Sequence, residues 1–122
     1  MALRLEAQRQ VVQDMHARLT KFVEEECLPA EAAFHEHVRS LPEHHSGWTV
    51  FPGLEALKKR AQELGLWNVW MPKTYPEGPG FTNLEYAHLC EVMGRCHLAA
   101  EACNCSAPDT GNMEVHCVWS TV

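Results

Sequence analysis

Apolar residues recur at helical spacing along the first half of the chain. Between Ala2 and about Cys27 they are separated by steps of three, four and seven, at Leu5, Val12, Met15, Leu19, Phe22 and Val23. This spacing predicts an amphipathic helix, with Arg9 among its outward-facing positions. Pro29 can begin a second helix over Ala30 to Val38, because a proline at the first helical position loses no hydrogen bond.

The helical pattern returns after a loop. The segment from Leu41 to Pro52 contains two prolines and Gly47 and few periodic apolar residues, which predicts a connection. From Pro52 the apolar positions again have helical spacing, and Gly65 is placed to end this helix. The short aromatic segment from Leu66 to Met71 is expected to be extended and packed beneath the loop that follows it.

A complete helix start signal follows that loop. Thr82 and Glu85 have the spacing of a capping box, in which the hydroxyl and the carboxylate each accept a hydrogen bond from a backbone N–H of the first turn. Phe81 and Tyr86 have the spacing of a hydrophobic staple. The sequence therefore predicts a helix that begins at Thr82, and Gly94 is expected to end it in a left-handed conformation.

The helix that begins at Thr82 is apolar on nearly every side. Its apolar positions cannot be gathered on one narrow stripe: Leu84, Tyr86, Ala87, Leu89, Cys90, Val92 and Met93. Glu85, His88 and Glu91 are its only polar interior positions, and they lie on one side. Such a helix is expected in the centre of a bundle. With no convincing alternating pattern elsewhere, the prediction is an all-α bundle of about five or six helices.

Composition narrows the function classes. The 122 residues suit one domain, and a net charge of -6 argues against nucleic-acid binding, which needs clustered Lys and Arg. No apolar run approaches the roughly 20 residues of a transmembrane helix. Glu6 and Asp14 interrupt the first segment, which argues against a secretory signal and against a mitochondrial transit peptide, because transit peptides are poor in acidic residues. No convincing targeting signal is therefore expected.

The loop from Asn104 to Met113 is the most promising ligand-binding segment. It supplies neutral hydrogen-bonding side chains next to a proline and a predicted helix start, where free N–H groups suit an anionic or carbonyl-bearing ligand. The candidate residues are Asn104, Ser106, Asp109, Thr110, Gly111 and Asn112. The alternative is that these residues only begin a helix.

Six cysteines raise a rival interpretation, a metal or redox module. Cys103 and Cys105 are followed by His116 and Cys117, but there is no Cys-x-x-Cys pair and the spacing fits no common zinc site. Reduced, unligated thiols are expected, with Cys90 acting as a small apolar residue. The histidines at 35, 37, 44 and 45 are expected on the surface, and Trp67, Trp70 and Tyr75 are expected to pack the core and anchor loops.

Several motifs resemble the acyl-CoA dehydrogenase family, most of all the branch of family members ten and eleven. They are the Gly65-Leu66-Trp67 and Met71-Pro72 motifs, the run from Gly78 to Ala87, the run from Glu91 to Arg95, and Asn104 to Val115. The pair Pro76-Glu77 after Tyr75 departs from the commoner Tyr-Gly-Gly, which indicates a branch. The resemblance covers residues 1–115 and implies the N-terminal helical domain of that family.

The resemblance implies a role in FAD-dependent desaturation of fatty acyl-CoA, in fatty acid β-oxidation. It implies that this domain walls one side of the acyl-CoA pocket, while the catalytic carboxylate lies in the C-terminal domain and the flavin is held mainly by the other two domains. No catalytic residue is therefore expected in this chain, and no FAD is expected on it alone. The resemblance also implies a mitochondrial location, with peroxisomes as the alternative.

The last residues, 116–122, depart from the family pattern, so the chain is expected to be truncated after Val115 and inactive by itself. An apolar face left without its β-domain is expected to be exposed, favouring self-association. The alternative of a different class is a helical interaction module that pairs with full-length subunits or competes with them.

Overall fold

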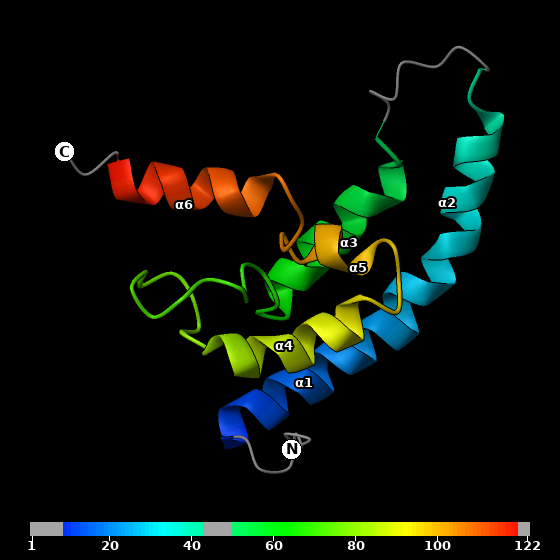
Figure 1. The fold of residues 1–122 in the computed structure, drawn as a ribbon. Coiled ribbons are helices and arrows are strands. Elements are labelled where there is room, and N and C mark those ends of the chain that lie inside the picture. The colour runs from blue at the N-terminus through cyan, green and yellow to red at the C-terminus, as the bar shows by residue number, and fades with distance from the viewer. Residues whose placement is uncertain (1–8, 43–49, 120–122) are drawn as a thin grey trace.

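The computed structural model describes residues 9–42 and 50–119, and all regular elements there are helices (Figure 1). They are α1 (Gln10–Phe22), the π-helix η2 (Val23–Cys27), α2 (Leu28–Ser40), α3 (Pro52–Glu63), α4 (Asn83–Met93), α5 (Ala99–Ala102) and α6 (Asp109–Trp119). The all-α prediction is confirmed. Residues 2–8 of the first predicted helix, and His44 and His45, lie outside the described residues.

The first three elements form one continuous helical rod rather than two helices joined by a loop (Figure 1). Pro29 has no N–H to donate, so an α-helical bond from it to the preceding turn cannot form. A π-turn stands directly before this proline, and in it the N–H of Leu28 donates to the carbonyl of Val23. The predicted boundary near Cys27 is thus a change of helix type.

The core lies where α1 and α4 run side by side (Figure 1). The buried apolar residues of α1 occupy one face, as its spacing predicts: Val12, Met15, Leu19 and Phe22. They meet Leu89, Val92 and Met93 of α4 in a cluster that α3, α5 and the loop around Leu66 complete. Segments distant in sequence therefore share one interior.

The prediction that α4 is buried on all sides is wrong. Leu84 is 41% exposed, and Ala87 and Cys90 are also exposed, whereas Leu89 is fully buried. The reason is tertiary, since α4 packs against α1 on one flank and contacts α5 near its end. The opposite flank has no covering element among the described residues.

Two glycines were expected to end helices, and they behave differently. Gly65 has a φ of 68°, and Leu66 N–H closes the end of α3 on the carbonyl of Ala61 at 2.8 Å, so that prediction is confirmed. Gly94 has a φ of -64° and donates to the carbonyl of Cys90 at 2.8 Å, so the left-handed stop predicted there is wrong. After Gly94 the chain continues through right-handed turns into α5.

The segment from Leu66 to Met71 is a series of turns and not an extended strand. Leu66, Val69 and Met71 are buried, so the expected packing is present. The turn depends on Asn68, whose φ is 59°, and the N–H of Met71 donates back to its carbonyl at 3.0 Å. A left-handed residue reverses the chain here, which an extended segment would not allow.

In the loop before α4, the backbone of Gly78 packs closely against Met71, which is possible because glycine has no side chain. A Cβ at this position would meet the Cβ of Met71 and lie 2.7 Å from the Met71 carbonyl oxygen. Gly78→Ala should therefore lower the free energy of unfolding by about 1–3 kcal/mol, because backbone atoms must move apart. Urea denaturation measures this. Gly111→Ala is the control, since nothing lies within 4 Å of the added Cβ, and it should not destabilise.

Candidate functional site

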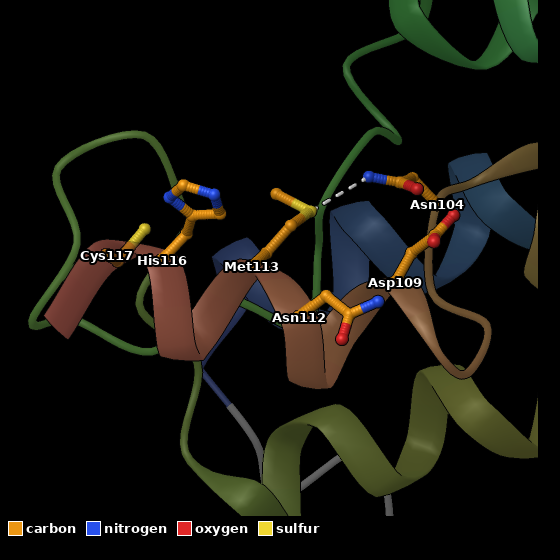
Figure 2. A pocket seen from close by; sticks show the side chains of 6 residues that line it. All are labelled: Asn104, Asp109, Asn112, Met113, His116 and Cys117. Carbon is orange, nitrogen blue, oxygen red and sulfur yellow. Dashed lines mark hydrogen bonds between the residues drawn. The ribbon is translucent and has the colours of Figure 1, made fainter. Parts of the chain in front are cut away.

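A hollow of about 360 Å³ lies against α6 (Figure 2). It is lined by Asn104, Asp109, Asn112, Met113, His116 and Cys117. Three of the six residues singled out in the sequence therefore meet around one space, namely Asn104, Asp109 and Asn112. Ser106, Thr110 and Gly111 are not among the lining residues. The hollow is bounded by α6, which projects from the bundle (Figure 1).

Asn104 is held in place by two loops. Its φ is 53°, a left-handed conformation that asparagine tolerates better than most residues. Its carbonyl accepts a hydrogen bond from the Trp70 indole at 3.0 Å, and its Nδ2 donates to Asn68 Oδ1 at 2.6 Å. Asn68 N–H donates in turn to the carbonyl of Cys103 at 3.0 Å. The two left-handed asparagines thus join the turn after α3 to the loop after α5.

Sequence reasoning missed Asn68. Its signal was present, because an asparagine between bulky apolar residues is a common site for a left-handed turn. Only the tertiary structure brings it to Asn104, which is 36 positions away. The prediction that Trp70 anchors a loop is confirmed, since Trp70 is half-buried and its indole N–H binds the loop after α5.

Ser106 and Thr110 take part in starting α6. The Thr110 N–H donates to the carbonyl of Ser106 at 3.4 Å, and the Asn112 N–H donates to the carbonyl of Pro108 at 3.1 Å. Asp109 lies in the first turn, where a negative charge interacts favourably with the helix dipole. For these residues the structure agrees with the alternative that they begin a helix.

The hollow is bordered by side chains that carry amide, carboxylate, imidazole and sulfur groups, and most of its lining surface is apolar. Lys58 forms an ion pair with Glu101 at 2.9 Å and is near enough to Asp109 for their charges to interact. The pKa of Lys58 is raised, mainly by its hydrogen bond to Glu101, and the charge of Asp109 contributes to a smaller degree. Lys58 therefore stays positively charged near this end of the hollow.

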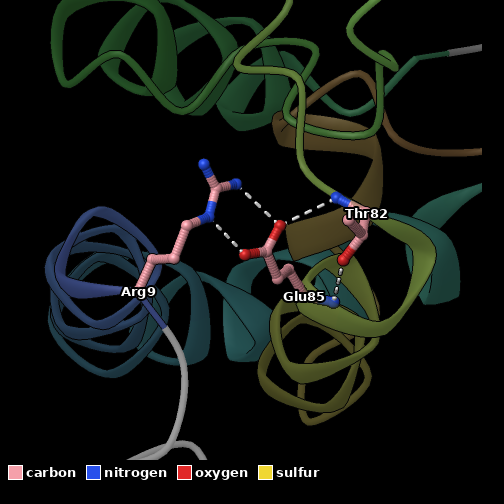
Figure 3. Close-up of polar contacts among 3 residues, drawn as sticks. All are labelled: Arg9, Thr82 and Glu85. Carbon is pink, nitrogen blue, oxygen red and sulfur yellow. Dashed lines mark hydrogen bonds and ion pairs between the residues drawn. The ribbon is translucent and has the colours of Figure 1, made fainter.

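A second polar cluster joins α1 to α4 (Figure 3). The predicted capping box is confirmed: Glu85 N–H donates to Thr82 Oγ1 at 3.2 Å, and Thr82 N–H donates to Glu85 Oε2 at 2.9 Å. Arg9 adds a bidentate pair, with Nε 2.6 Å from Glu85 Oε1 and an Nη 2.8 Å from Oε2. Arg9 is exposed, as its place in the helical pattern predicted, and as the cap residue of α1 it also reaches across to this buried carboxylate.

The Glu85 carboxylate is held strongly in its charged form. The Arg9 guanidinium, with the Thr82 N–H, lowers the pKa of Glu85 from 4.5 to about 2. Between these two pH values the unfolded chain binds a proton that the folded chain does not, so stability falls as pH falls through this window. Its contribution is fully present above pH 4.5.

Glu85→Gln should therefore flatten the loss of stability between pH 4.5 and about 2, while it lowers stability at neutral pH. Urea denaturation across this range measures both effects. Glu91→Gln is the control, because Glu91 is exposed on the same helix, and its profile should follow the parent chain. An unchanged slope in Glu85→Gln would contradict the role given to Arg9.

The sequence is similar to curated acyl-CoA dehydrogenase family members. Acyl-CoA dehydrogenase family member 10 of Mus musculus is 45% identical over 108 residues, covering 85% of this chain and 10% of that protein. Acyl-CoA dehydrogenase family member 11 of Rattus norvegicus is 35% identical over 112 residues, covering 92% and 14%. This chain is a homologue of the acyl-CoA dehydrogenases. No protein-family model matches it.

The fold of this acyl-CoA dehydrogenase homologue agrees with its sequence. A solved structure from Mycobacterium abscessus, assigned as an acyl-CoA dehydrogenase, matches 90% of the chain with a TM-score of 0.78 and 38% identity. The chain spans 28% of that structure. It thus corresponds to a small helical part of its relatives, and the resemblance noted in the sequence is confirmed.

The cysteines of the acyl-CoA dehydrogenase homologue are spread through the fold. Cys27, Cys96 and Cys103 are buried, and burial raises the pKa of Cys27 to about 12 and that of Cys105 to about 11. Such thiols react slowly. Among residues 9–42 and 50–119, no three His, Cys, Asp or Glu side chains are close enough together to hold a metal ion. Cys90 is exposed, contrary to its predicted place in the core.

The histidines also depart from expectation. His35 is exposed as predicted, but His37 is half-buried and its ring centroid lies 5.7 Å from that of Phe51. Within the described ranges, the Nε2 atoms of His37 and His88 are buried without a hydrogen-bond partner. Across the same residues, no helix has the length and apolar character that a bilayer span requires.

Proposed function

We propose that this chain forms one wall of the acyl-CoA cleft in an FAD-dependent acyl-CoA dehydrogenase. The reaction is the introduction of a double bond between the α and β carbons of a fatty acyl thioester. The observation that carries the proposal is the hollow beside α6, lined by Asn104, Asp109 and Asn112, in a segment that resembles the family. Homology to family members 10 and 11 supports it.

The residues around the hollow would orient the substrate and exclude water. Hydrogen bonds to Trp70 and Asn68 hold Asn104 in one conformation. Its side-chain amide therefore keeps a fixed orientation. A rigid polar group of this kind positions a ligand at small entropic cost. In the intact enzyme, bound FAD would supply the acceptor for the hydride of the β carbon.

We infer that the buried carboxylate of the described residues is not a catalytic base. Glu85 is the buried carboxylate of the described residues, and its pKa of about 2 makes it too weak a base for proton abstraction at neutral pH. Its oxygens are also occupied by Arg9 and Thr82. A polypeptide of these 122 residues alone should therefore lack dehydrogenase activity.

A purified sample of the chain tests this point directly. It should show no flavin absorbance after gel filtration, and it should reduce no electron acceptor when a fatty acyl-CoA is added. A yellow preparation that keeps its colour and reduces an acceptor would overturn the proposal that the chemistry lies outside these residues.

A chimeric enzyme tests whether this chain forms one wall of the acyl-CoA cleft. In the chimera, this chain replaces the aligned part of the Mycobacterium abscessus protein, with which it shares 38% identity. The chimera should bind flavin and oxidise a fatty acyl-CoA. Asn104→Gly or Asp109→Asn should raise KM by about tenfold, the effect of losing one hydrogen bond. Glu114→Gln, exposed on α6 and outside the hollow, is the control. A flavin-loaded chimera whose KM is the same in all four forms would contradict the proposal.

A second candidate function is a helical interaction module. The observation that favours it is the exposure of apolar residues on α6, where Trp119 is 72% exposed and Val115 and Val118 are also exposed. A partner surface buries such residues. Sedimentation velocity should show self-association that Trp119→Ser reduces, and an intact dehydrogenase subunit should co-purify if the partner is a full-length relative.

We further propose a mitochondrial location, on the family resemblance alone, with peroxisomes as the alternative. Fractionation of cells that express the chain with a C-terminal epitope distinguishes the two. Recovery in neither organelle would contradict this assignment.

A further inference from the structure

The helices α1 and α4 run side by side in the same direction, and an ion pair lies at each end of their contact (Figure 1). At the start, Arg9 Nε lies 2.6 Å from Glu85 Oε1. At the far end, beyond both helices, Arg95 Nη2 lies 3.0 Å from Glu24 Oε1. We call this line of contact the α1–α4 seam, with Arg9, His16 and Glu24 on one side and Glu85, His88 and Arg95 on the other.

Two imidazoles lie in the middle of the α1–α4 seam. His16 of α1 and His88 of α4 are both half-buried, and they are near enough for their charges to interact. His16 borders a hollow of about 210 Å³ together with Thr20, Glu91 and Arg95. Among the described residues, the Nε2 atom of His88 is buried without a hydrogen-bond partner. The seam thus holds two basic groups where neither ring is fully hydrated.

We propose that the α1–α4 seam is acid-sensitive, so that protonation of His16 and His88 weakens the packing of α1 against α4 below neutral pH. Above pH 7 histidine is mostly uncharged, and two neutral rings can remain half-buried. Two imidazolium ions would repel each other across the seam, and each would lose part of its hydration. A proton on His88 Nε2 would also gain no acceptor. The proposal does not depend on the dehydrogenase role.

The charged groups around His16 offset this cost only in part. The negative charge of Glu91 favours protonated His16, but burial and the charge of His88 act in the opposite direction and are listed in that order of size, both ahead of Glu91. Arg95 adds a positive charge to the same hollow and is already paired with Glu24. Thr20 Oγ1 lies 3.5 Å from His16 Nδ1, and a hydroxyl carries no charge that could neutralise the ring.

The response of the seam to acid begins at a higher pH than that of Glu85. Burial, and then the charge of His88, lower the pKa of His16 below its ordinary value of 6.5. As pH falls through 6.5, the unfolded chain therefore binds a proton that the folded chain does not, and stability falls. Glu85 in the folded chain stays charged down to about pH 2. Its pair with Arg9 therefore persists while the middle of the seam weakens.

Amide hydrogen exchange of the 122-residue chain tests the proposal at about pH 7.5 and about pH 5.5, on either side of histidine titration. Rates are corrected for the pH dependence of intrinsic exchange. In the parent chain, peptides from α1 and α4 should exchange at least about threefold faster at the lower pH. The double variant His16→Gln/His88→Gln should lose this rise, because glutamine takes up no proton. Each chain is compared with itself at the two pH values, so an overall change in stability cancels.

His37→Gln is the matched control. In the part of the chain that the structure describes, His37 Nε2 is also buried without a partner, but it belongs to α2. This variant should keep the parent's rise in α1 and α4. Equal corrected rates at the two pH values in the parent chain would overturn the proposal, and so would a rise that survives in the double variant.

A titration of the parent chain followed by proton NMR needs no variant to fold. The imidazole of His16 should titrate with a midpoint below 6.5. A midpoint at or above this value would mean that protonation does not weaken the seam, and it would overturn the proposal as well.

Discussion

Leu89→Ala is expected to lower the free energy of unfolding by about 2–5 kcal/mol. Leu89 is fully buried between α4 and its neighbours, so truncation removes apolar contacts and leaves a cavity that the packed helices can only partly fill. Urea denaturation monitored by far-UV circular dichroism measures the change. The loss is a large share of the stability that a chain of this size possesses.

Leu84→Ala is the matched control for Leu89→Ala. It makes the same chemical change on the same helix, but Leu84 is 41% exposed. We expect a change of about 0.5 kcal/mol or less. Equal losses at the two positions would show that the outer flank of α4 is covered, and the description of α4 as half-buried would be wrong.

Phe22→Ala is expected to cost about 3–5 kcal/mol. Phe22 is the last residue of α1, is 1% exposed, and precedes the π-turn that accommodates Pro29. Its ring belongs to the core cluster, so truncation removes apolar contacts and leaves a cavity that the surrounding helices can only partly fill. Thermal and urea unfolding both measure the loss.

Val11→Ala provides the comparison for Phe22→Ala. Val11 belongs to the same helix but is exposed, so its truncation should change stability by about 0.5 kcal/mol or less. A destabilisation by Phe22→Ala no larger than that of Val11→Ala would contradict the place of Phe22 in the core.

The sequence predicted helix ends correctly where a capping box or a left-handed glycine lies at the end itself. The capping box at Thr82 and Glu85 is present, and Gly65 ends α3 in the left-handed conformation. These signals succeed because their hydrogen bonds join residues within one turn of each other. Gly94 shows the limit, since a glycine permits a left-handed stop without requiring it, and the route to α5 decided the outcome.

The candidate site was predicted only in part. Asn104, Asp109 and Asn112 were singled out and line one hollow. Asn68, which holds Asn104, and Arg9, which pairs with Glu85, were not recognised. Both partners are far away in sequence, and no local pattern states which side chain a distant polar group will meet.

What the sequence determined by itself is the class of fold and the family, because helical periodicity and short motifs depend on neighbouring residues. What the tertiary structure decided is which face of each helix is covered. The apolar positions of α4 look alike in sequence, yet Leu89 is buried and Leu84 is exposed. Burial depends on which element packs alongside, and for α4 that element is α1 on one flank.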